Sequence, residues 1–136
     1  MAGEVRRLFV YGSLLRGEAN HARYCADALT IEPARTTGRL YHLPAGFPAM
    51  VEATDGVVYG EAMTFLDLEA PLGKTDLLEG YRPEGPERSL YLRRVQRVTL
   101  LGSGQTAAAY CYVWRGRSPH GAVLIPSGRW VPRAGQ

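Results

Sequence analysis

Short strand-forming segments, separated by glycine and proline, constrain the fold of this chain more than any other feature. The longest covers residues 90–101, and the turn Gly102-Ser103-Gly104-Gln105 leads from it into a second strand over residues 107–114. Glycine and proline interrupt regular structure, so long uninterrupted elements are not expected. Many short strands, few helices and abundant turns predict an α+β fold, with a small curled mixed β-sheet or barrel and a few short helices.

Three other segments are predicted strands. Residues 7–11 are rich in the β-branched and aromatic residues that favour strands, residues 38–43 form a candidate strand that ends at Pro44, and residues 57–63 have strand propensity. The dipeptide Asp55-Gly56 before the last of them is a hairpin signal. Residues 44–49 contain two prolines and a glycine, which disfavour regular strand pairing. We therefore expect residues 44–49 to form a turn-rich loop.

Two short helices are expected between these strands. Asn20 is a suitable N-cap for the first helix, over residues 21–29, which carries an apolar stripe. The second helix covers residues 72–79 and ends at Gly80, because glycine readily takes the left-handed conformation that follows a helix.

The length of 136 residues suits a single domain over residues 1–136. From about residue 115 the tail is expected to be irregular, with its apolar segment 123–130 docked on the body. No run approaches the roughly 18 apolar residues of a membrane span, and the start of the chain lacks the apolar core of a signal peptide. A cytoplasmic protein without a membrane partner is therefore expected.

Charge and ligand spacing argue against two further classes of function. The net charge is only +3, and the one arginine cluster, Arg93, Arg94 and Arg97, is split between the two faces of a predicted strand. Nucleic-acid binding normally needs a coherent basic stripe and is not expected. The histidines are scattered, and Cys25 and Cys111 lie far apart, which predicts reduced, buried thiols and no metal site.

The first segment with chemical potential is Tyr11-Gly12-Ser13-Leu14, directly after the first predicted strand. Side chains near Gly12 are too small to shield successive backbone N–H groups. Such a turn can hold a carboxylate or a developing oxyanion. Glycine turns without a ligand are also common, and the motif alone leaves both interpretations open.

Two further sets of residues can carry chemistry. Glu79 stands directly before the glycine that ends its predicted helix, where the helix dipole disfavours a carboxylate. A functional role would explain that cost, although a solvated helix-end carboxylate gives the same pattern. Tyr91 and Arg93 share one face of a predicted strand, where they either position a polar substrate or form a surface pair.

Seven short motifs follow one another along the chain: Tyr-Gly-Ser-Leu from residue 11, Gly-x-Leu-Tyr from 38, Pro-x-Gly-Phe-Pro-Ala from 44, Gly-Glu from 60, Asp-x-x-Glu-Gly-Tyr from 76, Tyr-x-Arg from 91 and Ile-Pro-Ser-Gly-x-Trp from 125. In this order they resemble the γ-glutamylcyclotransferase-like family, most closely the branch of γ-glutamylamine cyclotransferase and the plant avirulence-induced proteins. Relatives usually carry aspartate before the tail tryptophan, where this chain has Arg129.

The resemblance implies an enzyme that needs no cofactor and acts on a small γ-glutamyl amine or γ-glutamyl amino acid. The α-amino group of the substrate attacks its own γ-carbonyl, which releases 5-oxoproline and the free amine. Glu79 is then the general base and acid, and substrate-binding positions are Tyr11, Gly12, Ser13 and Leu14, with Tyr91 and Arg93 as further candidates. Free glutamate is a poor base at neutral pH, so we expect burial to raise the pKa of Glu79.

Several alternatives stay open at this point. The Gly12–Leu14 turn holds either the oxyanion or the α-carboxylate of the substrate, and the leaving amine depends on loops such as residues 44–56 and 82–89. A binder of a γ-glutamyl-like or other anionic metabolite, without turnover, is the main alternative to an enzyme, and a silent interaction module is a third. A homodimer is compatible with the sequence. Ser13 lacks the Gly-x-Ser-x-Gly elbow of serine nucleophiles.

Overall fold

The computed structural model describes residues 5–18, 20–85, 87, 89–116 and 120–130. The strands in this part of the chain are β1 (Arg7–Val10), β2 (Thr30–Thr37), β3 (Arg39–His42), β4 (Pro48–Val51), β5 (Val57–Thr64), β6 (Tyr91–Leu100), β7 (Thr106–Trp114) and β8 (Val123–Leu124). The helices are α1 (His21–Tyr24) and α2 (Glu69–Glu79). No helix in the described ranges is long and apolar enough to cross a membrane.

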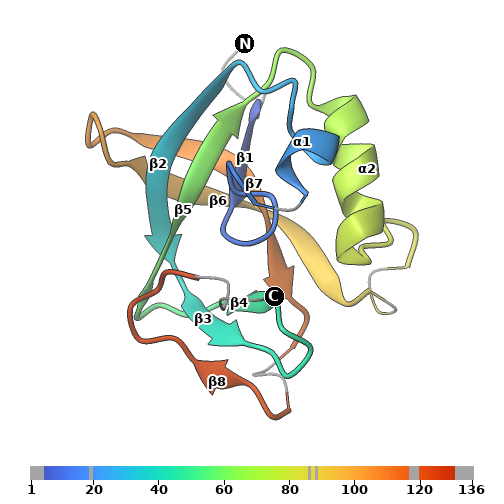
Figure 1. Ribbon diagram of the computed structural model, residues 1–136, viewed down its shortest axis with the longest axis vertical. Helices are drawn as coiled ribbons and strands as arrows, with labels where there is room; N and C mark the ends of the chain where they lie inside the picture. Colours follow the sequence, from blue (N-terminus) through green and yellow to red (C-terminus); the bar gives the residue numbers. More distant parts are fainter. Residues whose placement is uncertain (1–4, 19, 86, 88, 117–119, 131–136) are drawn as a thin grey trace.

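Five strands close into a barrel in the order β1-β5-β2-β6-β7. Neighbouring strands are antiparallel except β1 and β7, which pair in parallel where Leu8 lies opposite Tyr110. The barrel is therefore mixed, which confirms the predicted fold class. Helices α1 and α2 lie together on one side of it (Figure 1).

A second, three-stranded sheet in the order β4-β3-β8 lies at one end of the barrel (Figure 1). The tail joins this sheet through β8 and then returns to the barrel, where the backbone N–H of Tyr59 donates to the carbonyl of Gly128 at 2.8 Å. Ile125 and Trp130 pack against the buried core. The described part of the tail therefore contacts the barrel, and it contains a short strand. The guanidinium of Arg129 lies 4.0 Å from the ring centroid of Tyr59, so this departure from the family pattern contributes a cation–π contact.

Strand β1 separates two parts of the hydrophobic core, because its side chains alternate between two faces. Leu8 and Val10 pack in a cluster with residues of both helices, whereas Phe9 and Tyr11 pack with apolar residues of the other barrel strands. The chain leaves the barrel directly after β1, so the predicted Gly12–Leu14 turn starts from a strand that is buried on both sides.

Strand β2 was not predicted from the sequence. All eight residues of β2 pair with β5, and Pro33 sits in the middle of the strand. Pro33 has no N–H to donate, but its carbonyl accepts from Leu101 at 2.9 Å. A proline in an otherwise polar segment hid this strand from pattern reasoning.

Two other local predictions were wrong in extent. The helix predicted over residues 21–29 ends at Tyr24, because the backbone N–H of Leu29 already bonds to Thr64 and ties the chain to β5. Residues 44–49 do not stay a loop: β4 begins at Pro48, the first residue of an edge strand, where the missing N–H is tolerated. Asp55-Gly56 lies at a bend and forms no hairpin, since β4 and β5 belong to different sheets.

Candidate active site

A cavity of about 390 Å³ opens beside the barrel, between the turn after β1 and the C-terminal end of α2. The start of β4 and the start of β6 complete its walls. Gly12, Ser13 and Leu14 border this cavity together with Glu79, although the two segments are far apart in sequence. The structure therefore brings the predicted turn and the predicted carboxylate to one small space.

The turn after β1 is held in place by its own backbone and by Glu61. The N–H of Leu15 donates to the carbonyl of Gly12 at 3.0 Å, and the N–H of Arg16 donates to Oε1 of Glu61 at 2.7 Å. Asn20 reaches back and bonds to Ser13 twice, through its backbone N–H and through Nδ2 to Oγ, both at 2.9 Å. These contacts hold the turn in place without using the N–H groups of Gly12, Ser13 and Leu14.

Three consecutive backbone N–H groups, of Gly12, Ser13 and Leu14, have no hydrogen-bond acceptor within the described ranges of the chain. Buried or half-buried backbone donors normally have a partner, so three free ones at a cavity are available to solvent or to a ligand. Successive N–H groups of this kind suit an anionic oxygen. The turn thus has the donors that an oxyanion or a carboxylate needs.

Gly12 is required at this turn because the ring of Pro48 packs onto it. A Cβ on residue 12 would lie 2.8 Å from Cγ of Pro48, closer than real side-chain atoms approach. Pro48 starts β4 and is held by strand pairing, so it has little room to move. The motifs that begin at residues 11 and 44 therefore meet in space.

Glu79 is the last residue of α2. The helix ends at Gly80, which adopts the left-handed conformation with φ of 69°. The carbonyl of Gly80 accepts from Leu90 at 3.0 Å, which ties the helix end to the start of β6. The side chain is only partly exposed, and burial raises the pKa of Glu79 to about 7, in the direction expected from the sequence. Within the described residues its carboxylate has no hydrogen bond or ion pair.

The raised pKa of Glu79 should be visible in how the stability of the protein depends on pH. Because the folded state holds the Glu79 proton more tightly than the unfolded state, stability falls as pH rises from about 4.5 to about 7. Glu79→Gln removes the charge, so we expect this variant to melt at a higher temperature than wild type at pH 8. The difference should disappear near pH 4.5, and scanning calorimetry across this range measures it.

Two buried tyrosines lie next to Glu79 but use their hydroxyls elsewhere. Tyr11 donates to the carbonyl of Tyr112 at 2.7 Å and Tyr91 donates to the carbonyl of Pro48 at 2.8 Å. Burial and the Glu79 charge raise the pKa of both phenols. Both rings line the cavity. Tyr11 and Tyr91 thus shape the cavity as neutral phenols, and their protons are already committed to backbone carbonyls.

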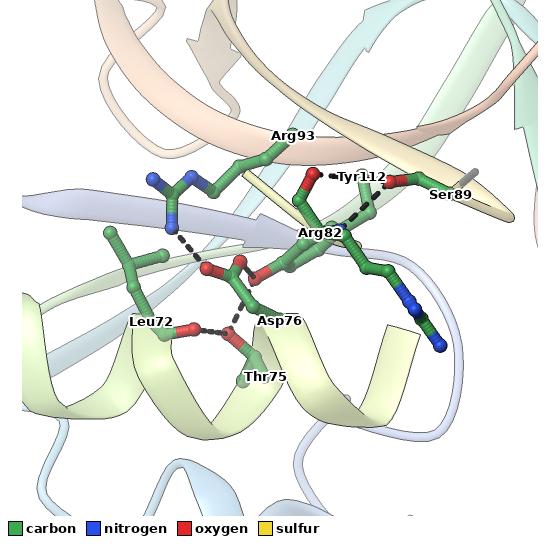
Figure 2. Close-up of polar contacts among 7 residues, drawn as sticks. All are labelled: Leu72, Thr75, Asp76, Arg82, Ser89, Arg93 and Tyr112. Carbon is green, nitrogen blue, oxygen red and sulfur yellow. Dashed lines mark hydrogen bonds and ion pairs between the residues drawn. The ribbon is translucent and has the colours of Figure 1, made fainter. Parts of the chain in front are cut away.

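The structure does not bring Arg93 to the cavity. Its Nη1 donates to Oδ2 of Asp76 at 2.7 Å, and the second oxygen of Asp76 accepts from the hydroxyl of Tyr112 at 2.6 Å (Figure 2). The hydroxyl of Thr75 also lies 2.7 Å from that of Tyr112. Arg93 was a candidate for substrate binding because it shares a strand face with Tyr91. In the structure its charge is paired with the carboxylate of Asp76 instead.

Asp76 links the helix that carries Glu79 to the barrel wall. It lies one turn before Glu79 on α2, and it is buried. Its partners Arg93 and Tyr112 lie on β6 and β7, and Tyr112 also borders the cavity. The ion pair therefore positions α2, and with it Glu79, against the sheet.

Several residues that border the cavity were not assigned to the site from the sequence, among them Asn20, Phe47 and Tyr112. Asn20 was interpreted as a helix cap, but its side chain makes no cap hydrogen bond and bonds to Ser13 instead. Phe47 lies within the Pro-x-Gly-Phe-Pro-Ala motif, which offered a signal. Tyr112 offered none, since its partner Asp76 is 36 residues away.

Comparison with known protein families matches residues 8–132 to the family described as gamma-glutamyl cyclotransferase, AIG2-like. The chain belongs to this family. A cyclotransferase-type function follows at this level of description, because the match covers nearly the whole chain. A search of curated proteins found no match.

Solved structures of AIG2-like and related proteins share the fold. YkqA from Bacillus subtilis is 27% identical, with a TM-score of 0.68 over 93% of this chain, and this chain spans only 40% of the length of YkqA. An AIG2-like protein from Mus musculus is 22% identical, with a TM-score of 0.68, over 98% of this chain and 99% of that one. A protein of Arabidopsis thaliana is 24% identical, with a TM-score of 0.67, over 94% of this chain and 70% of that one.

Proposed function

We propose that this protein is a cyclotransferase that converts a γ-glutamyl amine or a γ-glutamyl amino acid to 5-oxoproline and the free amine. The observation that carries the proposal is the meeting of Glu79 with the free N–H groups of Gly12, Ser13 and Leu14 at one cavity. Family membership supports the same class of reaction.

The reaction needs one new bond and one broken bond. The α-amino nitrogen of the substrate bonds to the γ-carbonyl carbon, and the bond from that carbon to the leaving nitrogen breaks. Both reacting groups belong to one molecule, so the cavity accelerates the reaction largely by selecting a folded conformer. The α-ammonium group loses two protons as its nitrogen becomes the lactam N–H, and the leaving nitrogen gains two as it departs as an ammonium group. Glu79 takes up each proton and passes it on, so the reaction balances without another reactant.

Glu79 suits this transfer because burial raises its pKa to about 7, so that it accepts and returns a proton near neutral pH. The N–H groups of Gly12, Ser13 and Leu14 are the donors we assign to the substrate, either to its oxyanion or to its α-carboxylate. Tyr11 and Tyr91 supply the walls that pack against it. Arg93 has no direct role in this proposal, because Asp76 holds it outside the cavity.

The proposal is tested by incubating the protein with a panel of γ-glutamyl amines and γ-glutamyl amino acids and measuring 5-oxoproline. Release from at least one conjugate is the expected result. Tight binding of a conjugate without any release would favour the non-catalytic binder instead. Absence of both binding and release across the panel would contradict the proposal.

The pH dependence of the reaction provides a separate prediction. Glu79 must be ionised to accept the proton, so kcat/KM should rise with pH and reach its plateau above about pH 7. A pH–rate profile from pH 5 to 9 measures this limb. An acid limb near pH 4.5, the ordinary value for glutamate, would contradict a buried Glu79 as the base.

A further inference from the structure

The mouth of the cavity is built from large apolar side chains that are exposed to solvent. These mouth residues, which also border the cavity, are Phe47 (40% exposed), Leu77 (83%), Leu78 (37%) and Leu90 (47%). Single exposed leucines are common, but four large apolar side chains around one opening indicate a surface that contacts a ligand.

Charge is nearly absent from the same cavity. Among the residues that the structure describes, Glu79 is the only charged one at its walls. Arg93 does not border the cavity, and its guanidinium is paired with Asp76. A carboxylate on the leaving amine would therefore lie against the apolar mouth residues and find no counter-charge among the described walls.

The two halves of the proposed substrate have different places in this cavity. The free N–H groups of Gly12, Ser13 and Leu14 suit the oxygen atoms of the glutamyl half. Leu77 and Leu78 directly precede Glu79, the residue assigned to protonate the leaving nitrogen. Because Leu77 and Leu78 border the same cavity as Glu79, the substituent on that nitrogen is assigned to the mouth residues.

We propose that the leaving amine carries an uncharged apolar substituent, such as a short alkyl or aryl group, in contact with Phe47, Leu77, Leu78 and Leu90. This inference rests on the proposed function and adds the class of amine. A charged leaving amine is disfavoured in both signs: a carboxylate finds no cation among the described walls, and an ammonium group has only Glu79, which the reaction itself uses.

Three γ-glutamyl conjugates of similar length test this inference: those of n-butylamine, of β-alanine and of 1,3-diaminopropane. Their leaving amines end in a methyl, a carboxylate and an ammonium group. We expect kcat/KM for 5-oxoproline release to be at least about tenfold higher for the n-butylamine conjugate, since its butyl group gains apolar contact with the mouth residues and a charged end does not. Equal or reversed values would overturn the inference while release itself upholds the proposed function.

A pair of variants tests whether the mouth residues cause the preference for the n-butylamine conjugate. Leu77→Lys adds a cation at a mostly exposed position, so it should raise kcat/KM for the β-alanine conjugate relative to the n-butylamine conjugate by about fivefold to tenfold. Leu66→Lys is the matched control, because Leu66 is 73% exposed and does not border the cavity. A similar change from both variants would overturn the assignment.

Binding and assembly measurements separate the remaining outcomes. Calorimetry with the three conjugates reports their order even without turnover. If no conjugate releases 5-oxoproline but the n-butylamine conjugate binds at least tenfold tighter, the proposed function fails and the apolar preference stands. If binding shows no preference, the preference fails as well. If sedimentation instead shows a dimer that Leu77→Lys dissociates, with the order of conjugates unchanged, the mouth is a contact between two copies and the inference is overturned.

Discussion

Glu79→Gln should lower kcat for 5-oxoproline release by a factor of about 100 to 10,000, the usual contribution of a general acid–base residue. Glutamine keeps the size and the hydrogen-bonding shape of the side chain but accepts no proton at neutral pH. The N–H groups of Gly12, Ser13 and Leu14 are untouched, so the substrate should still bind with an affinity close to that of wild type. Single-turnover kinetics measure the chemical step, and calorimetry measures binding.

The matched control for this variant is Glu69→Gln, which makes the same chemical change at the first residue of the same helix. Glu69 is exposed and does not border the cavity. Its replacement should leave kcat unchanged within about twofold. If Glu79→Gln retained more than about a tenth of wild-type kcat, Glu79 would not be the proton carrier.

Asp76→Ala should strongly destabilise the protein. The substitution leaves the Arg93 guanidinium unpaired in a partly buried position and removes the acceptor of the Tyr112 hydroxyl. Breaking a buried ion pair from one side costs about 3 kcal/mol, because the remaining charge has lost its solvent and its partner. Urea unfolding at pH 7 measures this difference.

The exposed pair between Arg39 and Asp55 provides the matched control for Asp76. Its nitrogen and oxygen also lie 2.7 Å apart, but both side chains are well exposed to water. Asp55→Ala should therefore change the free energy of unfolding far less than Asp76→Ala does, since solvent screens the exposed charges. Equal effects of the two variants would show that Asp76 does not hold α2 to the barrel.

The elements that sequence predicted correctly are those with a strong local pattern. β1, β5, β6 and β7 are apolar or β-branched segments bounded by turns, and α2 ends at Gly80 as expected. β2 was missed because its partner β5 stabilises a polar segment with a proline in the middle, and that pairing is not local. The helix predicted over residues 21–29 is shorter for the same reason, since the pairing of Leu29 with Thr64 draws the chain into the barrel.

The candidate site shows the same division. Glu79 and the Gly12–Leu14 turn were accessible from motif order, because each motif depends on a local requirement for glycine or for a helix end. Arg93 was assigned to the substrate because strand alternation gives the face of a side chain but not what lies opposite it. Asp76, which lies on α2, pairs with Arg93 and also accepts a hydrogen bond from the hydroxyl of Tyr112.

The sequence alone determined the class of fold, the helix that carries Glu79 and the glycine turn that can bind an anion, since these depend on backbone preferences over a few residues. Only the tertiary structure decided that the carboxylate and the turn share one cavity, that Arg93 serves an ion pair, and that the mouth is apolar. These features depend on contacts between segments far apart in the chain, because burial, charge pairing and the shape of a cavity are properties of side chains that meet in space.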